Sequence, residues 1–451
     1  MTERQTTFTH LIILGIAALI LRVAYLLLAA DHLGWESFVH YVPDTRLYQA
    51  IAQHILSYHP LGGFGLLRVG PGYAILLVGL ELIFGQNPIW PILFNVLMGA
   101  LAPVFIYLLA YYLLKSRLVA FTAGTISALS LTSIALSCHI LTDQPFFTFH
   151  AAALVCFVLG FKTGKSRWFI LAGLMAGFAA YIRQSGQMWW PVFLFVPLVV
   201  PLQRYFSTRL EMLKRAGLAG AIMLLMIFGW CARNYATDGL FIFGTNGVLT
   251  ARSCLVAQIT AAQIEDGDLV EFRKKWEAED GDRTEEYAAA YDRAKARIIQ
   301  AVRTHPGLMF RTYFRNVQEN LKVPNYFAIR QVPLIRGIVK AVNDAVWHWL
   351  GHTLLVVTLA GLVVLIIRKN HLAWILLALT YAYFTLILGA SFWQGSRLHY
   401  SAEMAWAILV PYAVYFGISQ IGRLLTGLIA HARLLAREGR IRDWLARKRT
   451  S

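Results

Sequence analysis

Two aspartates stand where the chain leaves apolar segments that are long enough to cross a membrane. Asp44 lies in the stretch FVHYVPDTRLYQAIA, residues 38–52, and Asp143 lies in the short turn TDQP between two apolar runs. A carboxylate held at a membrane surface can accept the proton of an incoming hydroxyl group, which is the role of a general base. Each aspartate also has a simpler interpretation, because aspartate is common at helix starts and in turns that contain proline. The two interpretations of Asp44 are compatible, since a helix cap also holds the side chain still.

Four arginines lie at the predicted extracytoplasmic ends of membrane crossings, where the usual cytoplasmic bias of basic residues does not place them. They are Arg68, Arg183, Arg233 and Arg397. Any one of them can be explained as a long side chain that reaches for the membrane interface. Together they indicate an anion site, because the planar and permanently charged guanidinium group matches phosphate oxygens. Arginines and aspartates at one membrane surface therefore predict a site for a lipid phosphate.

The composition indicates an α-helical membrane protein with many crossings. Of the 451 residues 58% are hydrophobic, and the mean hydropathy is +0.55, whereas soluble domains are about 45–50% apolar. The apolar runs are too long and too continuous for barrel strands, and helices satisfy their own backbone hydrogen bonds in lipid. The net charge of +17 lies largely in short links and in the C-terminal segment. Anionic headgroups explain that charge, so no nucleic-acid partner is predicted.

The cysteines and histidines predict neither a disulfide framework nor a metal site. The cysteines have no ligand spacing, and three of them lie in or beside apolar runs; they are Cys138, Cys156, Cys231 and Cys254. The histidines are scattered in the same way, and packing or interfacial roles are favoured for each; among them are His139, His150 and His399.

A length of about 20 residues per crossing divides the chain into ten crossings, give or take one. They are expected at residues 11–30, 89–114, 118–140, 146–161, 168–183, 188–202, 216–231, 349–367, 372–391 and 404–422. The first run is too long for a signal-peptide core and is interpreted as an anchor. The basic links are predicted to be cytoplasmic; they are residues 115–117, 162–167, 203–215 and 368–370. The run from Pro71 to Gly85 would span only about 22 Å, so we expect an interfacial or re-entrant helix there.

This alternation predicts four regions along the chain. Residues 1–231 form an N-terminal transmembrane module, whose first outer segment at 31–88 carries Asp44. Residues 232–348 form a large extracytoplasmic loop. Residues 349–422 supply the C-terminal transmembrane helices, and residues 423–451 form a basic cytoplasmic tail that is expected to lie on the membrane surface.

Six motifs follow one another on the predicted outer face. They are PDTRLYQAIA at 43–52, RVGPGYAILL at 68–77, LTDQPFF at 141–147, GFAAYIRQSG at 177–186, GWCARNYATDGLFIFGTNGVL at 229–249 and GSRLHY at 395–400. In this order they resemble the polyprenyl-phosphate-sugar glycosyltransferases of the GT-C fold, the group that includes protein mannosyltransferases and lipid A aminoarabinose transferases. The fifth motif is the most specific. The chain departs from the pattern at Thr45, where several relatives carry a second acid, and at Leu398, where tyrosine is usual.

The resemblance implies an all-α GT-C bundle of about ten transmembrane helices with juxtamembrane helices on the outer face. It further implies an inverting glycosyltransferase in which Asp44 is the general base, while Asp143 positions acceptor or sugar or shares that role. The substrate-binding residues that it implies are Tyr48, Arg68, Arg183, Arg233 and Arg397, with Arg68 foremost at the departing phosphate. Because of Thr45, no metal ligand set is assigned, and a divalent metal stays an open alternative.

The expected partners are a polyprenyl-phosphate-linked sugar donor, membrane lipid and an acceptor. The acceptor is left open between lipopolysaccharide, another cell-envelope glycolipid, a cell-wall polymer and a protein. The expected location is the inner (plasma) membrane, with the active site on the periplasmic face. A transporter or flippase of lipid-linked sugars is the alternative, since it would use the same groove and arginines but would need no base. A non-catalytic scaffold is the third hypothesis, and it would not need several arginines gathered on the outer side.

Overall fold

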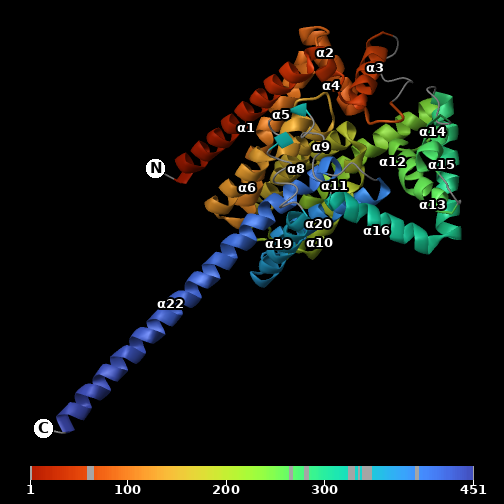
Figure 1. Cartoon of the computed structure of the whole chain (residues 1–451). Helices are drawn as coiled ribbons and strands as arrows, with labels where there is room; N and C mark the ends of the chain where they lie inside the picture. Colours follow the sequence, from red (N-terminus) through yellow and green to blue (C-terminus); the bar gives the residue numbers. More distant parts are fainter. Residues whose placement is uncertain are drawn as a thin grey trace.

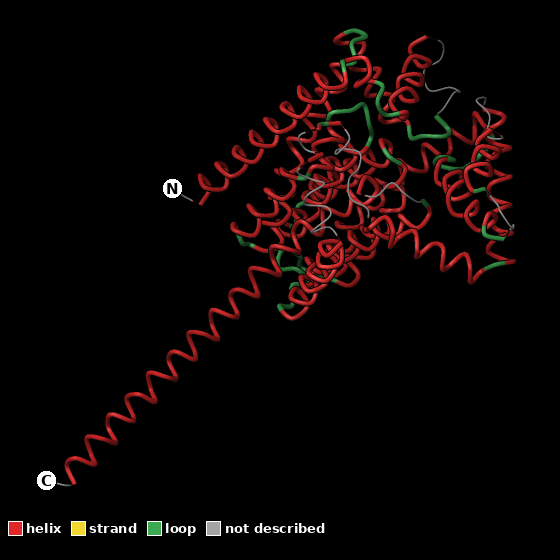
Figure 2. Tube along the Cα trace, viewed as in Figure 1, coloured by secondary structure: helices red, strands yellow, loops and turns green. Residues whose placement is uncertain are grey.

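The computed structural model describes residues 3–57, 66–263, 268–278, 284–322, 331–333, 336–337, 348–391 and 396–449. These residues form helices joined by short links, and no strand occurs among them (Figure 2). The predicted all-α class is confirmed. Parts of both predicted outer segments, including residues 58–65 and 323–330, lie outside the described residues.

The N-terminal half forms the central bundle (Figure 1). Within it α8 packs along α9, α9 along α11, and α5 along α1, α6 and α8. The elements are α1 (Glu3–Leu33), α2 (Trp35–Val39), α3 (Pro43–Ser57), α4 (Pro71–Phe84), α5 (Ile89–Leu114), α6 (Arg117–Leu129), α7 (Leu131–Ser137), α8 (Asp143–Thr163), α9 (Ser166–Ile182), η1 (Gln184–Trp189), α10 (Trp190–Val199) and α11 (Arg209–Asp238).

The remaining helices form a lateral group and then return to the bundle. The lateral group lies to one side of the bundle in Figure 1 and contains α12 (Asn246–Ala251), η2 (Arg252–Val256), α13 (Ala257–Ala261), α14 (Leu269–Ala278), α15 (Thr284–Thr304) and α16 (Pro306–Lys322). The returning elements are α19 (His348–Ile367), α20 (His371–Leu386), η4 (Ile387–Ala390), α21 (Ser396–His399), η5 (Tyr400–Ala402) and α22 (Glu403–Arg449). Of these, α22 packs on α19 and α6 and then extends far beyond the bundle (Figure 1).

Six helices of the described residues are long and apolar enough to cross a membrane: α1, α5, α8, α11, α20 with η4, and η5 with α22 as far as Ala430. A seventh crossing results if α6 and α7, which meet at a bend of 53°, count as one. Three shorter apolar helices lie at Pro71–Phe84, Ser166–Ile182 and Thr353–Ile367. The chain is thus a multi-pass membrane protein, while the number of ten crossings stays a prediction. The helix α4 has 14 residues and is as short as the sequence indicated.

The basic links meet at one end of the bundle. The side chain of Asn370 donates to the carbonyl oxygen of Leu113 at 2.9 Å, which joins the 368–370 link to the end of α5. Arg215 at the start of α11 donates to the carbonyl oxygen of Gly164, which lies between α8 and α9. The link at 115–117 directly follows α5, and the charges of Lys115 and Arg204 both act on Lys162. All four basic links therefore lie beside one another.

The two acidic turns lie away from that basic end. The helix α8 begins at Asp143 and ends at Thr163, beside the basic links, and has 21 residues. At 1.5 Å per residue it is about 31 Å long, which matches the hydrocarbon core of a bilayer. Asp143 is therefore separated from the basic links by about one membrane thickness.

Candidate active site

Two acids and two arginines form a compact ion-pair cluster at the end of the bundle remote from the basic links. Asp143 Oδ1 lies 2.7 Å from Arg183 Nη1, and Asp143 Oδ2 lies 3.3 Å from Arg397 Nη2. The same Arg397 nitrogen lies 2.6 Å from Asp44 Oδ2. Residues that are far apart in the sequence thus share one electrostatic site, in which the formal charges cancel.

The two carboxylates differ sharply in exposure. The side chain of Asp143 is only 2% exposed and is paired on both oxygens, whereas that of Asp44 is 42% exposed and is paired on one. Burial lowers the pKa of Arg397, but Asp143 and Asp44 more than offset this and raise it above its ordinary value. Arg397 therefore stays charged, and Asp44 is the acid of the cluster that an incoming molecule can reach.

Local helix chemistry explains where the acids lie. Asp44 and Asp143 each occupy the first turn of a helix, α3 and α8 respectively. Negative charge is favoured there, because the first backbone N–H groups of a helix carry partial positive charge. Thr45 Oγ1 lies 3.4 Å from the carbonyl oxygen of Ile140, so the start of α3 is held against the turn that precedes α8.

A buried asparagine fixes the turn between α7 and α8. Asn95 Nδ2 lies 2.6 Å from the carbonyl oxygen of His139 and 3.0 Å from that of Leu141. It also lies 3.0 Å from the hydroxyl group of Tyr73 on α4. Asn95 is fully buried on α5. It thereby sets the height at which Asp143 begins its helix, a role that the sequence alone did not reveal.

Tyr48 lies beside the cluster, one turn after Asp44. Its hydroxyl group is 3.4 Å from Thr142 Oγ1, which also accepts from Arg183 Nη1 at 3.3 Å. Burial, followed by the charge of Asp44, raises the pKa of Tyr48 to about 12. The phenol is therefore neutral near pH 7 and can donate a hydrogen bond to a substrate, but it cannot serve as the base.

Arg68 lies near this site without being paired in it. Gln184, the neighbour of Arg183, donates to the carbonyl oxygen of Arg68 at 2.8 Å. Among the described residues, no side chain forms an ion pair with the Arg68 guanidinium group. It is thus a cation that is held close to Arg183 and is available to an incoming anion.

Arg233 takes a different place from the other predicted cations. It is paired with Asp238 at 3.2 Å and lies over the ring of Trp230, 4.9 Å from the ring centroid. No contact joins it to Asp44, Asp143 or Arg397 in the described part of the chain. Its predicted role in substrate binding stays a prediction.

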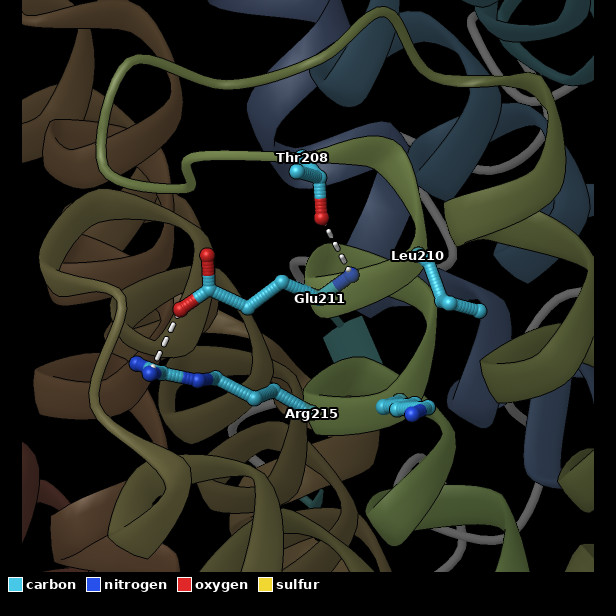
Figure 3. A pocket seen from close by; sticks show the side chains of 5 residues that line it. Thr208, Leu210, Glu211 and Arg215 are labelled. Carbon is cyan, nitrogen blue, oxygen red and sulfur yellow. Dashed lines mark hydrogen bonds and ion pairs between the residues drawn. The ribbon is translucent and has the colours of Figure 1, made fainter.

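The structure also holds a pocket at the opposite, basic end (Figure 3). It is lined by Thr208, Leu210, Glu211, Lys214 and Arg215. There Thr208 Oγ1 accepts from the backbone N–H of Glu211, and the Glu211 carboxylate pairs with Arg215 (Figure 3). These contacts complete the first turn of α11. Within the described residues no group of three His, Cys, Asp or Glu side chains is arranged to hold a metal ion.

Comparisons with known proteins agree with the helical arrangement. Residues 68–245 match a family model described as dolichyl-phosphate-mannose-protein mannosyltransferase. No curated protein sequence matches the chain. Among solved structures, the oligosaccharyltransferase of Archaeoglobus fulgidus in complex with Zn and sulfate matches 93% of this chain at 15% identity, with a TM-score of 0.53. The archaeal oligosaccharyltransferase AglB from the same organism, in complex with an inhibitory peptide and a dolichol-phosphate, matches 94% at 15% identity, with a TM-score of 0.55.

The chain has the GT-C fold. It spans about half the length of the two archaeal structures, 51% and 52%. The family match covers Arg68, Asp143 and Arg183 but ends before Arg397 and begins after Asp44. The GT-C bundle therefore brings residues from outside the matched segment into the same ion-pair cluster.

Proposed function

We propose that the chain is an inverting glycosyltransferase that moves a sugar from a polyprenyl-phosphate donor to an acceptor hydroxyl group at the outer face of the membrane. One arrangement carries this proposal: an accessible carboxylate, Asp44, lies beside arginines that a buried carboxylate, Asp143, holds in place. An accessible base next to fixed cations is what transfer away from a phosphate requires.

The reaction follows from the positions of these groups. Asp44 accepts the proton of the acceptor hydroxyl group while the acceptor oxygen forms a bond to the anomeric carbon. The bond from that carbon to the phosphate oxygen breaks on the opposite side, so the configuration inverts. The leaving group is the polyprenyl phosphate, which gains the negative charge. Arg397 is contacted by both acids and would turn from Asp44 to the phosphate, which frees the carboxylate for the acceptor.

The arginines supply the stabilisation of the leaving group. Asp143 neutralises one charge of the Arg183 and Arg397 pair, and Arg68 adds a further cation on a segment that packs beside Arg183. Fixed donors that face developing charge are worth about 3 kcal/mol each. Tyr48 would donate to a sugar or phosphate oxygen. The two ion pairs of Asp143 support a positioning role for it, since both of its oxygens already face arginines.

The outer-face location is supported by the separation along α8. The basic links gather at one end of the bundle, and basic links are retained on the cytoplasmic side. The acidic turns lie about 31 Å away at the other end, on the length of the 21-residue helix α8. The lipid tail of the donor would then lie between helices while its phosphate reaches the outer surface, in an inner-membrane protein whose site is periplasmic.

The comparisons support a chemical class for the donor, and the proposed reaction requires a hydroxyl group on the acceptor. The matched family uses dolichyl-phosphate-mannose, and one archaeal neighbour holds dolichol-phosphate, which supports a polyprenyl-phosphate carrier with one hexose or pentose. The acceptor carries a hydroxyl group and is a glycan, a glycolipid or a protein.

A transfer assay tests the proposal. Purified protein in lipid nanodiscs is incubated with polyprenyl-phosphate mannose labelled in the sugar and with membrane extract as acceptor. Label should leave the polyprenyl-phosphate donor with the wild-type protein, and Asp44→Asn should abolish this transfer while the protein remains folded and inserted. Glu36→Gln is the matched control, because Glu36 is an exposed acid of the same outer segment and its side chain is 87% exposed.

Other outcomes separate the competing activities. A flippase would move labelled lipid between leaflets of a vesicle with the sugar still attached, and Asp44→Asn would leave that movement intact. Near-normal transfer by Asp44→Asn would remove Asp44 from the mechanism.

A further inference from the structure

A buried polar network lies directly beneath the ion-pair cluster. The hydroxyl group of Tyr400 lies 2.8 Å from Gln144 Oε1 and 2.9 Å from Ser133 Oγ. Ser133 Oγ in turn lies 3.1 Å from Gln144 Oε1, so the three side chains close a triangle. All three residues are buried and come from η5, α8 and α7. The triangle therefore joins three separate elements by hydrogen bonds alone.

An arginine in the first helix completes this network. Arg22 Nη2 donates to Ser133 Oγ at 2.6 Å, and Nη1 donates to the carbonyl oxygen of Ala18 at 3.0 Å. Arg22 is fully buried inside α1, which is a candidate membrane span. A Cβ atom on Gly99 of α5 would collide with the Arg22 side chain, so the neighbouring helix leaves room for it. A charged group inside a membrane helix is costly, which indicates a functional reason for keeping it.

The network repeats, one layer deeper, the connection that the active site makes at the surface. Gln144 directly follows Asp143, and Tyr400 lies three residues after Arg397. The Tyr400–Gln144 hydrogen bond thus joins the same two chain segments as the Arg397–Asp143 ion pair. The surface pair is 3.3 Å long, and its arginine is 18% exposed, whereas the deeper bond is shorter and shielded from water.

We infer that Tyr400 and Gln144, linked through Ser133 to Arg22, position Arg397 against Asp143 for the transfer step. This inference rests on the proposed function and adds positioning residues to it. Arg397 must leave Asp44 for the phosphate when a donor binds, and its own segment must not move with it. The deeper hydrogen bond holds that segment while the guanidinium group changes partner.

The first test removes one hydroxyl group. Tyr400→Phe keeps the ring, which stacks on Phe147 at a centroid distance of 4.5 Å, and removes only the two contacts of the hydroxyl group with Ser133 and Gln144. Turnover of labelled polyprenyl-phosphate mannose should fall about 10-fold or more, because small displacements of a reacting group cost that much. The KM for the donor should change by less than about twofold, because ground-state binding does not need the exact placement of Arg397.

Tyr107→Phe is the matched control. Tyr107 on α5 is also buried, and its hydroxyl group lies 3.3 Å from Nδ1 of His10 on α1. This contact is far from the acids. Both variants lose one buried hydroxyl group, so a purely structural effect would lower thermal stability and turnover alike. The positioning role predicts that turnover falls in Tyr400→Phe alone.

A double-mutant cycle tests whether Tyr400→Phe lowers turnover through Arg397 or independently of it. If Tyr400 acts by placing Arg397, Tyr400→Phe should cost much less in an Arg397→Lys background than in the wild type. Additive losses would overturn the inference, and so would equal turnover of Tyr400→Phe and Tyr107→Phe. Should Tyr400→Phe fail to fold, Ser133→Ala, which removes the link to Arg22, must still lower turnover with the KM unchanged. Absence of transfer by the wild-type protein would instead overturn the proposed function itself.

Discussion

At the scale of single residues, the proposed mechanism divides the work between the two aspartates by their exposure. Asp143 is buried between Arg183 and Arg397, and its carboxylate forms an ion pair with each of them. Asp44 contacts Arg397 but is open to solvent, so it can exchange that contact for a substrate hydroxyl group. The proposed mechanism thus gives the same residue type two roles, because one side chain is 2% and the other 42% exposed.

Asp143→Asn should therefore mainly lower stability, whereas Asp44→Asn should mainly lower transfer. Asp143→Asn leaves two partly buried arginines without their shared counter-charge and should lower the free energy of unfolding by about 3 kcal/mol. Asp44→Asn breaks one partly exposed pair and should cost about 1 kcal/mol or less. Thermal unfolding in detergent, monitored alongside transfer, measures both. Equal losses of stability in the two variants would contradict this division.

At the scale of elements, the loop before α4 sets the place of Arg68. Gly70, the residue before α4, lies against the carbonyl oxygen of Tyr181 near the end of α9. A Cβ atom there would lie far inside van der Waals contact with backbone that cannot give way easily. This close approach carries Arg68 to the end of α9, where Arg183 begins the link to η1.

Gly70→Ala should push α4 away from α9 and lower both stability and transfer. The expected cost is about 1–3 kcal/mol, which is typical of overpacking. Gly79→Ala, inside the helix that Gly70 precedes, is the control, since a Cβ atom at Gly79 meets nothing within 4 Å. That variant should gain up to about 1 kcal/mol, because alanine favours helix interiors, and should transfer normally. Wild-type transfer in Gly70→Ala would show that the close approach does not matter to the site.

At the scale of the whole molecule, the site and the basic links define two faces. If the basic end is cytoplasmic, Ala50→Cys on α3 should react with a membrane-impermeant maleimide in intact cells, while Lys115→Cys should react only after permeabilisation. Both positions are exposed, and the four native cysteines are buried or half-buried, so background labelling should be low. Labelling in the reverse order would place the site on the cytoplasmic face.

A long-range contact behind the site predicts acid sensitivity. Gln331 lies 3.1 Å from His139 Nε2 and accepts from the Tyr25 hydroxyl group at 2.7 Å, so it joins α1 to the turn before Asp143. Burial lowers the pKa of His139 to about 4; Arg397 also lowers it, while the Gln331 contact raises it.

His139 is therefore neutral when folded and gains a proton on unfolding between pH 6.5 and pH 4. Above pH 6.5 His139 is neutral in both the folded and the unfolded chain, so its titration costs no stability. As the pH falls toward 4 the unfolded chain binds the proton first, and the free energy of unfolding falls by about 3 kcal/mol at most. Thermal unfolding across this range measures the loss, and His139→Asn should flatten the profile. His371→Gln, which changes an exposed histidine, should leave the slope unchanged.

Sequence patterns predicted where helices lie better than where a crossing is interrupted by a bend or a change of helix type. The crossing expected at 118–140 is interrupted at Ser130, which ends α6 and whose hydroxyl group caps α7. The crossing expected at 188–202 appears as the end of η1 followed by the ten-residue α10. Hydropathy reports the total apolar length of a segment, whereas a bend depends on local caps and on the neighbours that receive it.

The sequence by itself determined the helical membrane class, because long apolar runs in lipid must satisfy their backbone hydrogen bonds internally. It also indicated which acids and arginines lie at helix ends. Only the tertiary structure decided that Arg397 meets Asp44 across 353 residues, that Arg233 pairs with Asp238, and that Tyr400 and Gln144 form a hydrogen bond. These pairings depend on which helices pack together, and that is decided by close fits such as Gly70 on Tyr181, which hydropathy does not encode.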